Sequence, residues 1–311
     1  MSTTRSGTRV PTFLLLGAAK CGTTSLAHYL SQHPDVYFSE PKEPLFFEAE
    51  YEKGLEHYWE TYFRGWRGQR AVGEGRVWNL YLPFVAPRIR ESLPHARLIV
   101  LLRDPVERVH SHWWHRYSRG QESLGLAAAL EADRARIERG EGFVGEEGSH
   151  RWRAGLYRDG PSTGHRVLLD LGFYAEQLER YRALFPAAQC KVVLHEDLAA
   201  DPPREMRELF GFVGVDPDVL VTDTTVRNRR PERVRSPMAR RALFAARALG
   251  LRRLVPRRLR TLEHALLERP EQRPALDPGL RRELVAYYES HNARLERLLG
   301  RDLSSWRAPS P

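Results

Sequence analysis

The stretch that decides the fold runs from Phe13 to Gln32 and reads FLLLGAAKCGTTSLAHYLSQ. It begins with a short apolar run, residues 13–16, which Gly17 interrupts, and a turn of small residues follows as far as Gly22. After this turn, apolar residues recur at helical spacing up to Leu30. The pattern predicts a strand, a tight loop and a helix.

The loop between this strand and this helix has the features of a phosphate or sulfate site. Two glycines allow its backbone N–H groups to converge on a ligand, and the helix N-terminus adds further N–H groups and a positive dipole end. A lysine supplies a mobile positive charge, and three hydroxyls supply short donors. The predicted anion-binding residues are Lys20, Cys21, Gly22, Thr23, Thr24 and Ser25. The alternative is an ordinary strand–helix junction with a glycine turn and a hydroxyl cap.

The loop is not a Walker A loop, in which the lysine directly follows the second glycine. Here Lys20 precedes Gly22 by two positions, and Thr23 stands where the Walker lysine would be. GAAKCGTTSL instead resembles the phosphosulfate-binding loop of sulfotransferases that use 3′-phosphoadenosine 5′-phosphosulfate. This resemblance implies that compound as co-substrate. It also implies that Lys20 neutralises the charge that grows on the bridging oxygen as the nucleoside bisphosphate leaves.

A second pattern begins with ARLIVLL at residues 96–102, a run that is apolar except for Arg97 and that predicts a buried parallel strand. Arg103 leaves its carboxyl end, where open α/β sheets bind ligands, and Ser111 lies about two helical turns further on. A guanidinium and a hydroxyl suit a phosphate monoester. The sequence R-D-P-x-x-R-x-x-S closely resembles the 3′-phosphate motif of the same family, which implies that role for Arg103 and Ser111.

Glu43 is the candidate catalytic base. It lies between two prolines in SEPKEPLFF (residues 39–47), and the prolines exclude a helix there. Partial burial beside the two phenylalanines would make it a better base, although a solvated loop acid is the alternative. The order HPDV, KEP, FF is similar to that of heparan-type and bacterial sulfotransferases, in which this glutamate is the base. Many of them have a histidine where this chain has Leu45.

Three further groups of residues are singled out by the resemblance or by residue type. Glu74 matches a family glutamate, but Gly75 departs from the lysine found in many relatives, so Arg76 is the candidate substitute. The loop before the last helix covers the nucleotide in relatives, which implies a cofactor contact for Arg273 and, more weakly, for Arg269. His110, His112 and His115 do not share one helix face, so we predict no metal site.

The 41% of hydrophobic residues indicates a globular protein, and the net charge of +9 is unevenly distributed. Residues 227–260 contain thirteen arginines and one acid. Such a basic amphipathic segment either contacts an anionic membrane surface or packs on the catalytic domain, and we favour the second interpretation. The two cysteines, Cys21 and Cys190, cannot form a disulfide framework, and no apolar stretch approaches the roughly 20 residues of a membrane span. We therefore expect a cytoplasmic protein, with peripheral contact at the inner membrane face as the variant.

We therefore expect one α/β domain over residues 1–311, a P-loop-like three-layer fold with a mostly parallel central sheet and helices on both faces. Residues 1–8 are expected to be mobile, and residues 121–165 to form a lid that faces the acceptor. The predicted reaction is transfer of a sulfuryl group to a hydroxyl or amine of a carbohydrate, lipid or small-molecule natural product. The alternatives are a P-loop nucleotide kinase and a non-catalytic basic protein that binds membrane or nucleic acid. We expect no nucleic-acid partner and leave the oligomeric state open.

Overall fold

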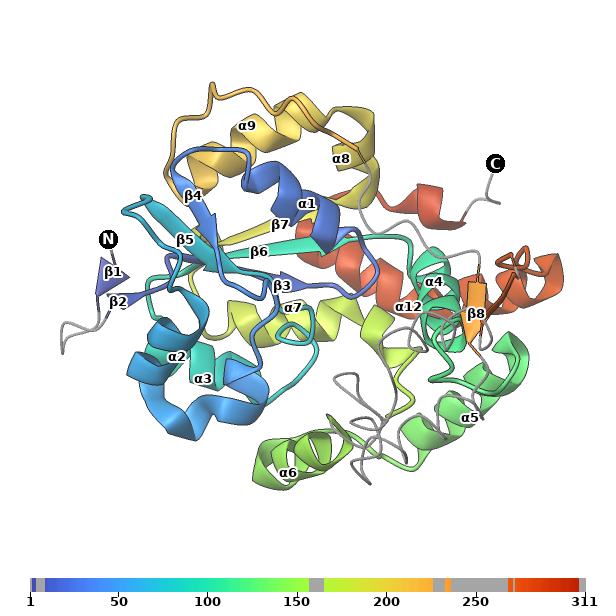
Figure 1. The fold of residues 1–311 in the computed structure, drawn as a ribbon. Helices are drawn as coiled ribbons and strands as arrows, with labels where there is room; N and C mark the ends of the chain where they lie inside the picture. The colour runs from blue at the N-terminus through green and yellow to red at the C-terminus, as the bar shows by residue number, and fades with distance from the viewer. Residues whose placement is uncertain are drawn as a thin grey trace.

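The centre of the molecule is a sheet of five strands in the order β4-β5-β3-β6-β7, with every pairing parallel (Figure 1). The computed structural model describes residues 2–3, 9–156, 165–225, 233–235, 268–270 and 272–307. The strands are β3 (Phe13–Gly17), β4 (Val36–Phe38), β5 (Ala71–Glu74), β6 (Arg97–Leu102) and β7 (Cys190–Leu194). The predicted α/β class with a mostly parallel sheet is confirmed.

The two central strands explain why the sheet is covered on both faces. Residues 13–16 of β3 are fully buried, and residues 98–102 of β6 are at most 2% exposed. A parallel strand that is buried on both faces is apolar throughout, as these are. Each buried leucine, isoleucine or phenylalanine contributes about 1.5–3 kcal/mol relative to its exposed state.

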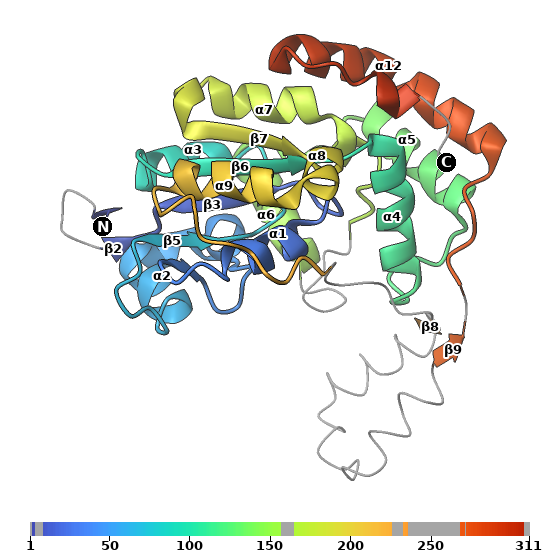
Figure 2. The ribbon, with the colours of Figure 1, turned by 90° about the horizontal axis from the view of Figure 1, so that it is seen from above.

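Helices surround this sheet. Helices α1 and α9 pack together on one face, and α7 packs with α12 on the other (Figures 1 and 2). The α-helices are α1 (Thr23–Leu30), α2 (Gly54–Tyr62), α3 (Val85–Ser92), α4 (Pro105–Tyr117), α5 (Leu126–Glu138), α6 (Gly145–Leu156), α7 (Tyr174–Arg182), α8 (His195–Ala200), α9 (Pro202–Val213) and α12 (Pro278–Leu299). A π-helical turn, η1 (Phe46–Glu50), precedes α2.

Three of these helices begin at an Asp-Pro pair. Asp104 caps α4 by accepting a hydrogen bond from the N–H of Val106 at 2.8 Å, and Asp201 and Asp277 cap α9 and α12 in the same way. Proline suits the first helical position because its missing N–H would have no intrahelical partner. Such caps stabilise a helix by about 1 kcal/mol and fix where it begins.

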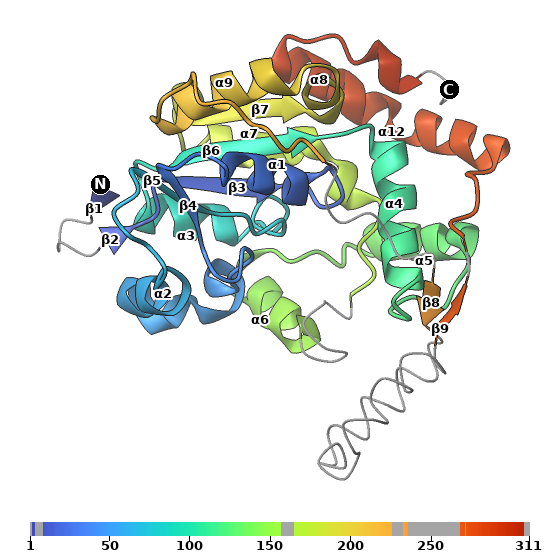
Figure 3. The same cartoon turned by 45° about the horizontal axis from the view of Figure 1, so that its top comes forward.

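The sheet order changes direction between β3 and β6. After β3 the chain forms β4 and β5 on one side of it, and then β6 and β7 on the other side. Open α/β sheets bind ligands outside the carboxyl ends of strands at such a point. Figure 3 shows α4 leaving the end of β6 next to the loop that leads from β3 to α1.

Two small antiparallel pairs lie outside the main sheet: β1 (Ser2–Thr3) with β2 (Arg9–Val10), and β8 (Arg233–Arg235) with β9 (Glu268–Pro270). Apart from β8, the basic segment 227–260 lies outside the described residues, and so do residues 1 and 4–8. The predictions of a basic amphipathic helix and of a mobile N-terminus concern these parts. Among the residues described, no helix is both long enough and apolar enough to cross a bilayer.

Candidate active site

The loop of residues 17–22 carries β3 into α1 and is tied to β6, because the N–H of Ala18 donates to the carbonyl of Leu101 at 2.8 Å. Gly22 has a φ of 101°, and a Cβ there would lie 3.3 Å from Cδ2 of His195. Lys20 also has a positive φ, 72°, which is uncommon for a residue with a side chain. Left-handed residues in such loops turn backbone N–H groups toward a common concavity that binds anions.

The start of α1 adds donors to this loop. Gly22 is the N-cap of α1, and no side chain in the described part of the protein caps the helix. The N–H groups of a first helical turn have no acceptors within the helix and carry its positive dipole end. Thr23 and Ser25 are buried against the fold, whereas Thr24 is half-buried. The predicted hydroxyls are therefore brought together at one helix end.

Cys21 differs from the other predicted loop residues. Its thiol is fully buried, with Sγ 3.6 Å from the hydroxyl of Tyr174, and burial raises the pKa of the thiol to about 11. Its N–H donates to the carbonyl of Ala18 at 3.2 Å. In this conformation Cys21 presents neither group to a ligand, so its part is to anchor the loop in the core.

Helix α4 lies along the same loop. The Nζ of Lys20 is 3.2 Å from Nδ1 of His115, and Ser111 is buried one helical turn before His115. Residues four apart share a helix face. Lys20 and Ser111, which are 91 positions apart in the sequence, thus belong to one site.

Three arginines meet at Glu107 on the first turn of α4. Arg103 and Arg273 each approach Oε2 of Glu107, at 3.5 and 3.6 Å, and Arg281 donates to Oε1 at 2.9 Å. Arg273 also contacts Nδ1 of His110 at 2.7 Å. The structure therefore brings together Arg103 and Arg273, which were predicted from separate parts of the sequence. It adds Arg281, which no pattern indicated.

Glu43 lies between two cations. Arg76 donates from Nη1 to Oε2 of Glu43 at 3.2 Å, and the Nζ of Lys42 lies 3.6 Å from Oε1. The side chain of Glu43 is 35% exposed, so it is accessible to an incoming acceptor. Two cations thus fix the position of this carboxylate from two sides.

Arg76 links Glu43 to a second acid that sequence reasoning missed. Its Nη2 forms an ion pair with the fully buried Glu48, which also accepts a 2.9 Å hydrogen bond from the indole N–H of Trp152 on α6. Burial raises the pKa of Glu48, and Arg76 lowers it. Trp152 also ties part of the predicted lid, residues 121–165, to the region beside Glu43.

The aromatic side chains of residues 51–66 pack in the core or against it. Tyr58 is fully buried and stacks on Phe46 with ring centroids 4.2 Å apart. Glu74, the last residue of β5, is 1% exposed and accepts a hydrogen bond from the side chain of Asn79 at 2.7 Å. Burial raises the pKa of Glu74 to about 8. Glu74 is a buried structural neighbour of the site.

The three histidines of α4 have different surroundings. His110 contacts Arg273 and stacks on Trp113, and His115 contacts Lys20. His112 is buried, and this burial, with nearby positive charges, lowers its pKa well below the usual value. Within the described ranges, no three His, Cys, Asp or Glu side chains are grouped to hold a metal ion.

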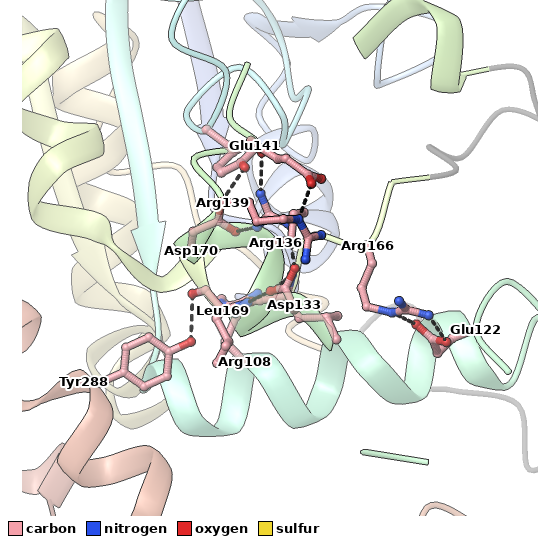
Figure 4. Close-up of polar contacts among 12 residues, drawn as sticks. Arg108, Glu122, Asp133, Arg136, Arg139, Glu141, Arg166, Leu169, Asp170 and Tyr288 are labelled. Carbon is pink, nitrogen blue, oxygen red and sulfur yellow. Dashed lines mark hydrogen bonds and ion pairs between the residues drawn. The ribbon is translucent and has the colours of Figure 1, made fainter. Parts of the chain in front are cut away.

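A network of buried hydrogen bonds holds α4 to the segment that precedes α7 (Figure 4). The segment before α7 accepts hydrogen bonds at its backbone from Arg108 of α4 and from Tyr288 of α12, at 2.8 Å for the latter. Asp133 of α5 accepts from the N–H groups of Leu168 and Leu169, at 2.9 and 2.7 Å. Three helices are thus held to one segment, and the side chains that α4 carries are held with them.

Comparison with known proteins places this geometry in a family. A family model described as a sulfotransferase domain matches residues 11–239. A crystal structure of a sulfotransferase from Alicyclobacillus acidocaldarius aligns with a TM-score of 0.63 and 29% identity, over 96% of this chain and all of that one.

Curated relatives agree with that assignment. The membrane-associated sulfotransferase kil1 of Dictyostelium discoideum is 27% identical over 67% of this chain and 56% of its own length. The heparan sulfate glucosamine 3-O-sulfotransferase 3B1 of Mus musculus is 28% identical over 67% of this chain and 47% of its own length. The chain spans about half of the length of these two curated relatives.

Proposed function

We propose, because this chain belongs to the sulfotransferase domain family, that it transfers a sulfuryl group from 3′-phosphoadenosine 5′-phosphosulfate to an acceptor hydroxyl or amine. The observation that carries the proposal is the meeting of Arg103 and Arg273 at Glu107, at 3.5 and 3.6 Å, at the sheet edge that also holds the loop of Lys20. Neither of the alternative functions, a nucleotide kinase and a non-catalytic basic protein, gains support from the comparisons.

The donor is a polyanion, and the residues present fit it. We assign its 5′ end to the loop N–H groups and to Thr23, Thr24 and Ser25, since a helix N-terminus favours phosphate. We assign its 3′-phosphate to Arg103, Ser111 and Arg273. A guanidinium bound to a phosphate forms strong charge-assisted hydrogen bonds, so Arg103 and Arg273 would exchange Glu107 for the phosphate.

In the proposed mechanism, the donor supplies the sulfuryl group, and the chain supplies position and charge. Glu43 accepts the proton of the acceptor hydroxyl or amine. Lys20 turns from His115 toward the bridging oxygen and neutralises the charge that develops there. Stabilising developing charge with groups that are already in place is usually the largest contribution to catalysis. The chemistry proposed for these residues uses no metal ion.

The acceptor is proposed by class only: a carbohydrate, a lipid or a small-molecule natural product. The relatives named for heparan sulfate support a carbohydrate. A cytoplasmic location remains our proposal, with peripheral membrane contact through residues 227–260 as its variant. The membrane-associated relative kil1 is compatible with that variant.

Two measurements test the proposal together. Calorimetry should show that 3′-phosphoadenosine 5′-phosphate binds more tightly than ATP. Mass spectrometry of a cell extract incubated with donor and enzyme should show a product that is heavier by one sulfate. Tighter binding of ATP, together with no sulfated product, would instead favour a kinase.

A further inference from the structure

We infer that Lys42 is a positioning residue for Glu43 and that Gly75 is a glycine because it makes room for the Lys42 side chain. This inference rests on the proposed function, in which Glu43 is the base. It concerns two residues that the resemblance to the sulfotransferase family leaves without a role.

The backbone around Glu43 is tied to the end of β5. The carbonyl of Lys42 accepts two hydrogen bonds, from the N–H of Gly75 at 2.9 Å and from the hydroxyl of Ser39 at 3.2 Å. Ser39 is itself buried, and its N–H donates to the carbonyl of Gly73 at 2.9 Å. The loop that carries the candidate base is therefore attached to the end of β5 at Ser39 and at Lys42, the residue before Glu43.

Gly75 is in direct contact with the Lys42 side chain. A Cβ on Gly75 would lie 2.5 Å from Cε and 3.1 Å from Nζ of Lys42. The backbone of Gly75 is not in the left-handed conformation that favours glycine. A methyl group at position 75 would therefore have to displace the end of the Lys42 side chain, whereas the conformation of the chain would accept it.

The ammonium of Lys42 is placed for a purpose other than solvation. Its nitrogen is shielded from solvent and makes no hydrogen bond within the described part of the chain, and its ion pair with Oε1 of Glu43 measures 3.6 Å. Burial lowers the pKa of Lys42, and Glu43 acts in the opposite direction. A lysine head is rarely removed from water unless it is paired.

Each of the two cations lies against a different oxygen of the Glu43 carboxylate. Arg76 holds Oε2 by a hydrogen bond, whereas Lys42 faces Oε1 without one. The charged groups around this carboxylate are Lys42, Arg76 and, behind Arg76, the buried acids Glu48 and Glu74. Oε1 is therefore the oxygen left to receive the acceptor proton, and Lys42 orients it.

The test compares variants of the full chain, with 3′-phosphoadenosine 5′-phosphosulfate as donor and the acceptor that the mass spectrometry proposed above identifies. Lys42→Met should lower kcat about 10- to 100-fold, because a small misplacement of a reacting group has effects of this size, and should leave donor affinity unchanged. A loss of kcat without a loss of donor affinity is a separation that a purely structural lysine would not cause. Lys53→Met, at an exposed lysine, is the control.

Gly75→Ala should lower kcat in the wild-type background but have little effect in a Lys42→Ala background, where no side chain opposes the new methyl group. Gly211→Ala is the matched control, since a Cβ there meets nothing within 4 Å. Equal effects of Gly75→Ala on kcat and on thermal stability in both backgrounds would overturn the inference. So would a Lys42→Met enzyme with the wild-type rate. A wild-type chain that binds and consumes no donor would instead overturn the proposed function, and the inference with it.

Discussion

Replacing Glu43 with glutamine tests the proposed base most directly. Glutamine has nearly the same shape, and its amide oxygen can still accept the hydrogen bond that Arg76 donates at 3.2 Å. It cannot accept the proton of an acceptor hydroxyl at neutral pH. General-base catalysis is typically worth about 100- to 10,000-fold, so kcat should fall by that factor, or about 2.7–5.5 kcal/mol in activation free energy.

The fold should tolerate this change. Arg76 keeps its ion pair with the buried Glu48, whereas the shielded ammonium of Lys42 loses the charge that it faces at 3.6 Å. Glu43 is 35% exposed, and ion pairs of such groups contribute about 0–1 kcal/mol to stability. The ion-pair partners of Glu43 are Lys42 and Arg76, which lie outside the loop of residues 17–22, so donor binding should be unchanged or slightly tighter.

The assay measures single-turnover rates with saturating donor, and the affinity for 3′-phosphoadenosine 5′-phosphate by calorimetry. Glu40→Gln is the matched control, because Glu40 lies in the same loop and is exposed. A Glu43→Gln enzyme with the wild-type rate would refute the reasoning. A variant that loses donor affinity as strongly as turnover would show that Glu43 supports the fold of the site instead of acting as its base.

Three further predictions concern the rest of the site. Arg103→Ala and Ser111→Ala should each weaken binding of 3′-phosphoadenosine 5′-phosphate much more than binding of adenosine 5′-phosphate, and equal losses in calorimetry would contradict the 3′-phosphate assignment. Lys20→Ala should slow the chemical step in single-turnover experiments more than it weakens donor binding, because the charge it opposes grows in the transition state. The pKa of buried Glu74, about 8 against an ordinary 4.5, means that its protonated form stabilises the fold fully below about pH 4.5 and that this contribution is lost as pH rises through 8. Glu74→Gln should therefore gain stability relative to wild type between pH 5 and pH 8.5 in urea unfolding, and an unchanged difference would argue against a protonated Glu74.

The sequence was sufficient where local pattern and position decide the structure. The apolar runs at residues 13–16 and 98–102 predicted buried parallel strands, and the two strands lie side by side. Glycine and hydroxyl residues after the first run predicted the loop and the helix start. These features are local, so neighbouring residues determine them.

The sequence was insufficient where a side chain's direction or partner depends on distant residues. Nothing in GAAKCGTTSL shows that the thiol of Cys21 faces the core, because that depends on Tyr174. Nothing around Glu48 indicates its contact with Trp152, 104 positions away. The meeting of three arginines at Glu107 likewise requires α12 to lie against α4, which no local pattern specifies.

The position of β3 at the centre of the sheet has a consequence for how the chain reaches its folded state. β3 is the first strand of the main sheet to be synthesised, yet its neighbours β5 and β6 begin only at residues 71 and 97. At a synthesis rate of about 5–20 residues per second, the apolar run FLLL emerges several seconds before either partner does. Pairings between distant segments also form slowly. The strand that positions the catalytic loop is therefore the segment of the nascent chain that most needs protection from aggregation, and expression at lower temperature or with a chaperone should raise the yield of folded protein.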